Sequence, residues 1–66
     1  MLFPPREELT ALYQAAKAGY ILQIKQEAHR IKQLDVKYIV FAHYVLKLAE
    51  EFEDEAIANL LKPHLT

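Results

Sequence analysis

The sequence contains no cysteine and no serine, and its only threonines are Thr10 and Thr66. Without cysteine the chain can form neither a disulfide nor a thiolate metal site. Without serine or cysteine it also lacks the usual nucleophiles that a neighbouring base activates. We therefore expect a protein that is not an enzyme. The absence of cysteine also fits a reducing compartment, so we expect a cytoplasmic location.

Glycine and proline are also scarce, with one Gly and three Pro in 66 residues. A single glycine cannot make the glycine-rich loop that holds phosphates, so we expect no cofactor.

The longest apolar run, 38–42, extends to residue 46 only if His43 is tolerated, whereas a membrane-spanning helix needs roughly 20 residues. Residues 1–5 lack a basic start and a long apolar core. We therefore expect neither a signal peptide nor a membrane partner.

Neither sign of charge is in excess, because eight Lys and Arg stand against nine Asp and Glu, for a net charge of −1. The most basic stretch, 20–37, carries only +2, from four basic and two acidic residues. That is too weak to bind a nucleic-acid backbone, so we expect no nucleic-acid partner. The stretch 47–62 carries −3, from two Lys and five acids. The opposite signs could align two copies of the chain, or the chain with a neighbour.

Helical patterns cover most of the chain, and a few residues punctuate them. Pro4 and Pro5 suit the first turn of a helix, and Gly19 suits the left-handed residue that follows one. Asp35 is a good N-cap, and Pro63 is expected to stop the last helix. These signals predict one all-α domain over residues 1–66, folded as a compact bundle of four short helices. The predicted helices are about 5–18, 20–33, 36–52 and 55–62.

Apolar residues recur at intervals of three and four, which places them on one face of each helix. The predicted core consists of Leu9, Leu12, Ile21, Ile24, Ala28, Ile31, Tyr38, Phe41, Val45, Leu48, Phe52, Ile57 and Leu60. In the segment 36–52 the apolar stripe extends almost around the helix, through Ile39, Val40, Ala42, Leu46 and Ala49. A helix that is apolar on most sides is buried on most sides. We therefore expect one side of this segment in the core and another against a protein partner.

Five acids occupy the six positions 50–55. A solvated, charged turn explains such a cluster better than paired catalytic carboxylates do. Asp54 could cap a fourth helix there. The pattern leaves open whether the last two helical segments are separate or form one kinked helix.

The three histidines, His29, His43 and His64, lie on different predicted helices and lack the HxxxH or HExxH spacing of a helical metal site. We therefore expect no bound metal.

His29 and Lys32 are nevertheless spaced as in the active-site helix of histidine phosphotransfer domains, which this segment resembles. There an exposed His accepts the phosphoryl group, and a Lys three positions later screens its charge. Gln33 stands where those domains usually have a Gly. Phosphotransfer through His29, with Lys32 beside it, is the alternative function.

Two spaced motifs stand out, Leu34-Asp35-x-x-Tyr38-x-x-Phe41-Ala42 and Leu48-Ala49-x-x-Phe52. The wider pattern also includes Pro4-Pro5, Glu8-Leu9, Leu12, Ala16, Gly19, Ile21, Ile24, Ala28, Ile31, Val45 and Ile57. Together they span nearly the whole chain. This pattern resembles a helical domain near the C-terminus of bacterial, notably cyanobacterial, hybrid sensor histidine kinases. Tyr20 departs from it, because the family often has an Asp there, and the family does not generally keep a His at position 29.

The resemblance implies a non-catalytic protein-interaction or dimerisation module of two-component signalling. Its parent would hold the kinase, the phosphorylated His and the receiver Asp elsewhere. The partner would be a second copy of the chain or the receiver or kinase domains of the parent. A pattern shared by a family is more often core than contact surface, so the interface is expected on the other side of the segment 36–52. That side carries Ile39, Val40, His43, Tyr44 and Lys47.

Overall fold

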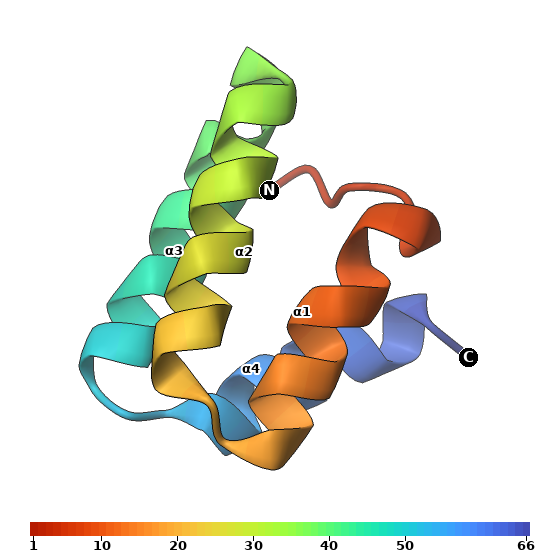
Figure 1. The fold of residues 1–66 in the computed structure, drawn as a ribbon. Helices are drawn as coiled ribbons and strands as arrows, with labels where there is room; N and C mark the ends of the chain where they lie inside the picture. Colours follow the sequence, from red (N-terminus) through yellow and green to blue (C-terminus); the bar gives the residue numbers. More distant parts are fainter.

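The computed structural model describes all 66 residues and contains four α-helices and no strand (Figure 1). The helices are α1 (Arg6–Ala18), α2 (Ile21–Leu34), α3 (Ile39–Glu50) and α4 (Asp54–Leu61). The short 3-10 turns η1 (Val36–Tyr38) and η2 (Lys62–His64) precede α3 and follow α4. The predicted all-α bundle of four short helices is confirmed. No helix is both long enough and apolar enough to cross a membrane.

Each helix packs against the next around a closed ring, so that α1 contacts α2, α2 contacts α3, α3 contacts α4 and α4 contacts α1. In Figure 1, α2 and α3 lie side by side and run in opposite directions, while α4 crosses behind α1. The radius of gyration is 10.2 Å, close to the roughly 10.8 Å expected for a compact domain of this length. The connections between helices are short, which keeps consecutive helices in contact.

The turn between α1 and α2 is a Schellman motif, in which a left-handed residue ends a helix. Gly19 takes the left-handed position with φ +76°. The N–H groups of Gly19 and Tyr20 donate to the carbonyls of Ala16 and Ala15, at 3.2 and 3.0 Å. Only glycine adopts this conformation without strain. The predicted end of the first helix at this glycine is confirmed.

The end of α3 has the same geometry without a glycine. Phe52 has φ +57°, and the N–H groups of Phe52 and Glu53 donate to the carbonyls of Ala49 and Leu48, at 3.0 and 2.9 Å. The helix therefore stops at Glu50, and α3 and α4 are separate helices. The expected continuous helix over 36–52 is wrong at both ends, because η1 opens it as a 3-10 turn and the Schellman motif closes it early.

The capping predictions have mixed outcomes. Asp35 caps η1, since its carboxylate accepts a hydrogen bond from the Lys37 N–H at 3.0 Å. Asp54, expected as a cap, is instead the first residue of α4, and Glu53 before it makes no side-chain cap bond. Pro63 lies in η2, beyond the end of α4.

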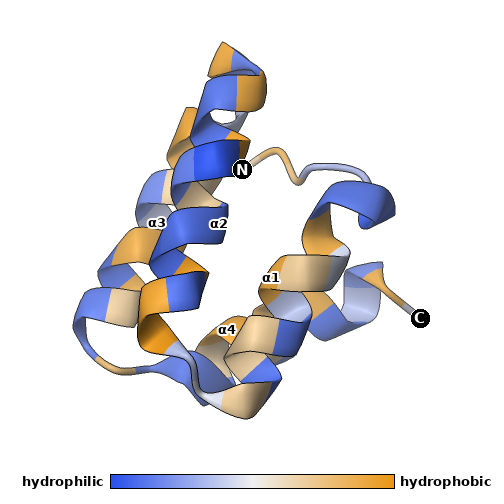
Figure 2. Ribbon diagram, viewed as in Figure 1, coloured by the Kyte–Doolittle hydropathy of each residue, from blue (hydrophilic) through white to orange (hydrophobic).

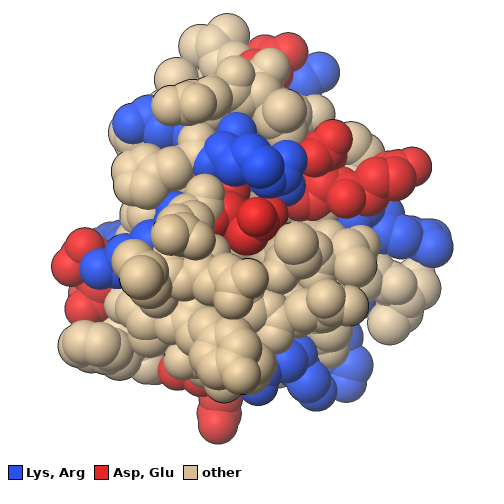
Figure 3. Space-filling model, viewed as in Figure 1, with Lys and Arg blue, Asp and Glu red and all other residues tan.

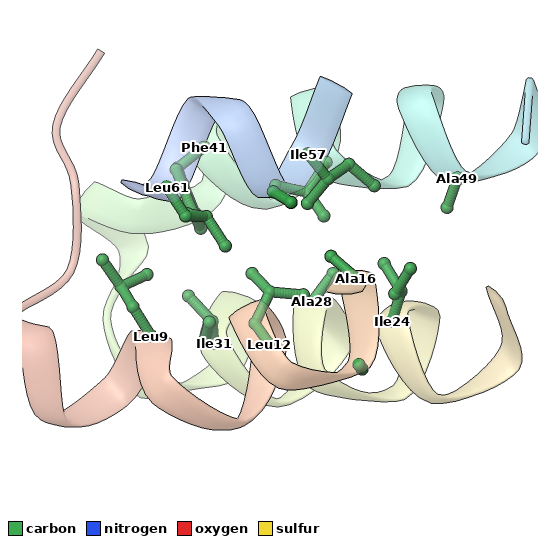
Figure 4. Packing of buried hydrophobic residues seen from close by; sticks show 13 residues of the cluster. Leu9, Leu12, Ala16, Ile24, Ala28, Ile31, Phe41, Ala49, Ile57 and Leu61 are labelled. Carbon is green, nitrogen blue, oxygen red and sulfur yellow. The ribbon is translucent and has the colours of Figure 1, made fainter. Parts of the chain in front are cut away.

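The core is one cluster to which all four helices contribute, and Figure 4 shows side chains of α1 and α2 pointing toward those of α3 and α4. Its members are Leu9, Leu12, Ala15, Ala16, Ile24, Ala28, Ile31, Phe41, Val45, Ala49, Ile57, Ala58 and Leu61. The predicted core positions Ile21, Tyr38 and Leu48 are half-buried and pack against this cluster. The alanines allow the helices to approach closely, which suits such a small bundle.

Two of the predicted core positions are wrong. Phe52 is 73% exposed, because α3 ends before the helical period would turn this residue inward. Leu60 is only half-buried, whereas Leu61 is fully buried. Ile57 and Leu61 are four residues apart and share the inward face of α4, so Leu60 falls at the edge of that face.

Phe3 and His64, near the two ends of the chain, pack against each other. The ring of Phe3 lies 5.1 Å from that of Phe41 and stacks on the ring of His64, with centroids 3.9 Å apart and an interplanar angle of 12°. Pro4, which follows Phe3 in the chain, is also buried. The segment before α1 therefore covers one side of Phe41, a contact that the helical periodicity did not indicate.

Candidate functional site

The side of η1 and α3 that faces away from the core carries large apolar side chains. Val36 is 77% exposed, Val40 65% and Tyr44 43%. They follow one another at intervals of four residues, which places them along one side of a helix. We call this side, with the exposed His43 and Lys47, the outer face of α3. In Figure 2, hydrophobic segments appear along α3 and where α2 leads into η1.

The structure places four of the five predicted interface residues together on this face, namely Val40, His43, Tyr44 and Lys47. The fifth, Ile39, is half-buried, so it offers less surface to a partner. Val36 is not among the predicted interface residues, and it extends the row by one turn. Because Val36 lies four residues before Val40, the sequence already contained a signal that the two residues share one side of the helix.

The outer face belongs to a firmly anchored helix. The opposite side of α3 buries Phe41, Ala42, Val45 and Ala49. No glycine or proline interrupts residues 36–50. The apolar row is therefore held at fixed spacing, and little backbone freedom remains to be lost on binding.

Phe52 adds an exposed aromatic ring at the end of α3. A residue with a Cβ is strained by roughly 1–2 kcal/mol in the left-handed region, and a bulky residue is a rare occupant. The sequence pattern predicts Phe52 as a core residue because it continues the stripe of Phe41, Val45 and Leu48. The run of acids 50–55 around it was the signal that it lies in a solvated turn.

Charges of opposite sign lie at the two ends of the outer face. Lys37 lies in η1, with its Nζ atom 5.4 Å from the centre of the Tyr38 ring. At the other end, Glu50 pairs with Lys25 at 3.1 Å, whereas Glu51 is exposed and makes no ion pair. In the view of Figure 3, basic and acidic side chains form small neighbouring groups of both signs, not an extended field of one sign.

Arg30 links α1 to α2. Its guanidinium donates to the Glu8 carboxylate at 2.7 Å, to the Glu8 carbonyl at 3.1 Å and to the Glu27 carboxylate at 2.9 Å. These hydrogen bonds, first that to Glu8 and then that to Glu27, raise the pKa of Arg30 above its ordinary value. The group lies partly in solvent, so water screens these bonds between the two helices and each contributes little to stability.

His29, the alternative phosphoacceptor, is exposed on α2, and its imidazole makes no hydrogen bond to another protein group. Lys32, almost one turn further, is half-buried, and Gln33 is exposed. The arrangement leaves the His29 imidazole open to a phosphoryl donor. No three or more His, Asp or Glu side chains gather where they could hold a metal ion.

Two surface hollows lie away from the outer face. One, of about 290 Å³, lies between α1 and α4 and is lined by Ala16, Lys17, Glu55, Ala58 and Asn59. The other, of about 210 Å³, lies beside the turn between α1 and α2 and is lined by Ala11, Gln14, Ala15, Tyr20 and Gln23. The first lining contains one basic and one acidic side chain, Lys17 and Glu55, and the second contains no charged side chain.

The outer face of α3 is thus the candidate site, defined by an exposed apolar row on a rigid helix with a basic and an acidic end. No protein-family model, no curated protein and no solved structure matches this chain.

Proposed function

We propose that this chain is a non-catalytic protein-interaction module of a cytoplasmic two-component hybrid sensor histidine kinase, and that it acts through the outer face of α3. The observation that carries the proposal is the exposed row of Val36, Val40 and Tyr44. Single exposed apolar residues are ordinary, but a contiguous row is typical of a contact surface. The sequence resemblance supports the signalling context.

The composition of the face suits protein contact. Tyr44 combines an apolar ring with a hydroxyl that can stay in water, and such residues are enriched at interfaces. His43 and Lys47 give the row a polar rim. A helix of a receiver or kinase domain, or of a second copy, could lay its own apolar residues along this row.

An NMR titration tests the proposal. The labelled chain is mixed with the receiver and kinase domains of a hybrid histidine kinase, and it is also measured over a dilution series. We expect shift changes within residues 36–47 in at least one of these experiments, lost in Val40→Asp. Leu22→Asp is a matched control, because Leu22 is 71% exposed on α2 and lies off the outer face. If neither the added domains nor the dilution series changes the chemical shifts of these residues, the proposal is wrong.

A second function, histidine phosphotransfer, rests on the exposure of His29 with Lys32 almost one turn away. Incubation with a phosphorylated receiver domain would then place an acid-labile label on the wild-type chain. His29→Gln would carry no label. An unlabelled wild type would remove this function and leave the interaction module untouched.

A further inference from the structure

We propose that the outer face of α3 binds a second copy of the chain, with the two α3 helices antiparallel about a two-fold axis at Tyr44. The proposal rests on the proposed function above and names the partner of that surface. In an isologous pair of this kind, a residue a given number of positions before Tyr44 lies opposite the residue the same number of positions after it.

The residues on the two sides of Tyr44 are complementary in charge. Lys37 lies seven residues before Tyr44, and Glu51 lies seven residues after it. Seven residues are close to two helical turns, so the three lie nearly in line along one side. In the antiparallel pair Lys37 of each copy lies opposite Glu51 of the other, and the symmetry makes this contact twice. A parallel pair would instead place like charges together, which disfavours it.

Both charges are available for such a contact. The ion pairs within the chain join Lys25 to Glu50 and Arg30 to Glu8 and Glu27, and none of them uses Lys37 or Glu51. Lys37 and Glu51 are both exposed. A partner can therefore engage them without breaking an existing ion pair.

Exposed apolar residues lie on both sides of Tyr44 in the sequence. Val36 lies eight residues before Tyr44 and is 77% exposed, and Phe52 lies eight residues after it and is 73% exposed. Val40, four residues before Tyr44, lies opposite the half-buried Leu48. Exposed apolar side chains therefore extend beyond both ends of α3, next to the charged positions 37 and 51.

The seam is short, because it uses only η1, α3 and the turn after it. We expect it to bury less than the roughly 800 Å² per partner of standard interfaces. We therefore expect a weak dimer, with a dissociation constant on the order of 0.1–1 mM. An attachment of two copies to a larger assembly would raise their effective concentration.

Sedimentation equilibrium on charge-reversed variants tests the proposal. The chain concentration should run over about 0.05–2 mM, because this range brackets the expected dissociation constant. Lys37→Glu and Glu51→Lys each turn both ion pairs into repulsions, so each should weaken self-association roughly tenfold. An equimolar mixture of the two variants restores opposite charges at both contacts. It should associate as strongly as the wild type. Arg6→Glu, an exposed charge reversal on α1, is the matched control and should leave the affinity unchanged.

Three results would overturn the proposal: a wild type that stays monomeric at the highest concentration, single variants that associate normally, or a mixture that fails to recover. Circular dichroism of each variant confirms that it is folded. Failure here is distinguishable from failure of the proposed function. A monomeric chain whose outer face still shifts with receiver or kinase domains, in a Val40-dependent manner, would keep the interaction module and exclude the self-pair.

Discussion

Replacing Phe52 by glycine and by alanine separates the strain of its backbone from the loss of its ring. Both variants lose the ring, so its loss cancels when their stabilities are compared. They differ only in the Cβ that alanine keeps at φ +57°. The chain also contains its own reference, because Gly19 occupies the same position of the same motif at φ +76°.

The expected magnitude follows from these dihedral angles. A Cβ in the left-handed region raises the folded-state free energy by roughly 1–2 kcal/mol, and the larger unfolded-state entropy of glycine offsets about 0.5–1 kcal/mol of this. Phe52→Gly should therefore be more stable than Phe52→Ala by about 1 kcal/mol. Gly19→Ala should lower the free energy of unfolding by a similar amount. Its new Cβ would lie 3.4 Å from Asp54 Oδ2, an ordinary contact, so backbone strain alone sets the effect.

Urea and thermal unfolding followed by circular dichroism measure these differences. For a domain of this size, about 1 kcal/mol corresponds to roughly 4–8 °C in Tm. Dilute samples keep any self-association out of the measurement. If Phe52→Gly and Phe52→Ala agreed to within about 0.3 kcal/mol while Gly19→Ala was destabilised, Phe52 would not hold a left-handed backbone in solution.

Three further variants test the helix packing and capping. Leu12→Ala, at a fully buried position, should lower the free energy of unfolding by about 2–5 kcal/mol, and urea denaturation will show whether the domain still unfolds cooperatively. Arg30→Met removes the exposed links to Glu8 and Glu27, so the loss should be only about 0.5–1 kcal/mol, measurable as a small fall in the urea midpoint that disappears at high salt. Asp35→Ala removes the cap on η1 and should destabilise the chain by about 1 kcal/mol, with faster amide exchange at Lys37 if the cap orders that turn.

Local chemistry was sufficient to predict most of the fold. The intervals of three and four between apolar residues located four helices and most of the core, and Gly19 and Asp35 marked helix boundaries through their own backbone and side-chain preferences. The exposed side of the segment 36–52 followed from its excess of apolar residues. These are short-range properties, which a sequence displays directly.

Other features depend on contacts between distant residues. Phe3 lies between Phe41 and His64, far apart in sequence, and no local pattern indicates that contact. The early end of α3 depends on the chain turning back so that α4 can pack against α1. With Phe at the left-handed position in place of Gly, the usual sequence signal for that turn is missing. The same missing signal explains the wrong assignment of Phe52 to the core.

The positions that break local rules are concentrated on one segment, and this concentration favours a contact surface there. Val40 is a β-branched residue at an exposed position of α3, where residues such as Lys or Glu have higher helix propensity, and Val36 is exposed in η1. Phe52 exposes its ring from a backbone conformation that glycine would adopt without strain. None of the three adds to the buried cluster, whose α3 members are Phe41, Val45 and Ala49. Local choices that do not serve the fold of the single chain are expected where a surface serves a partner, and here they flank Tyr44 on both sides.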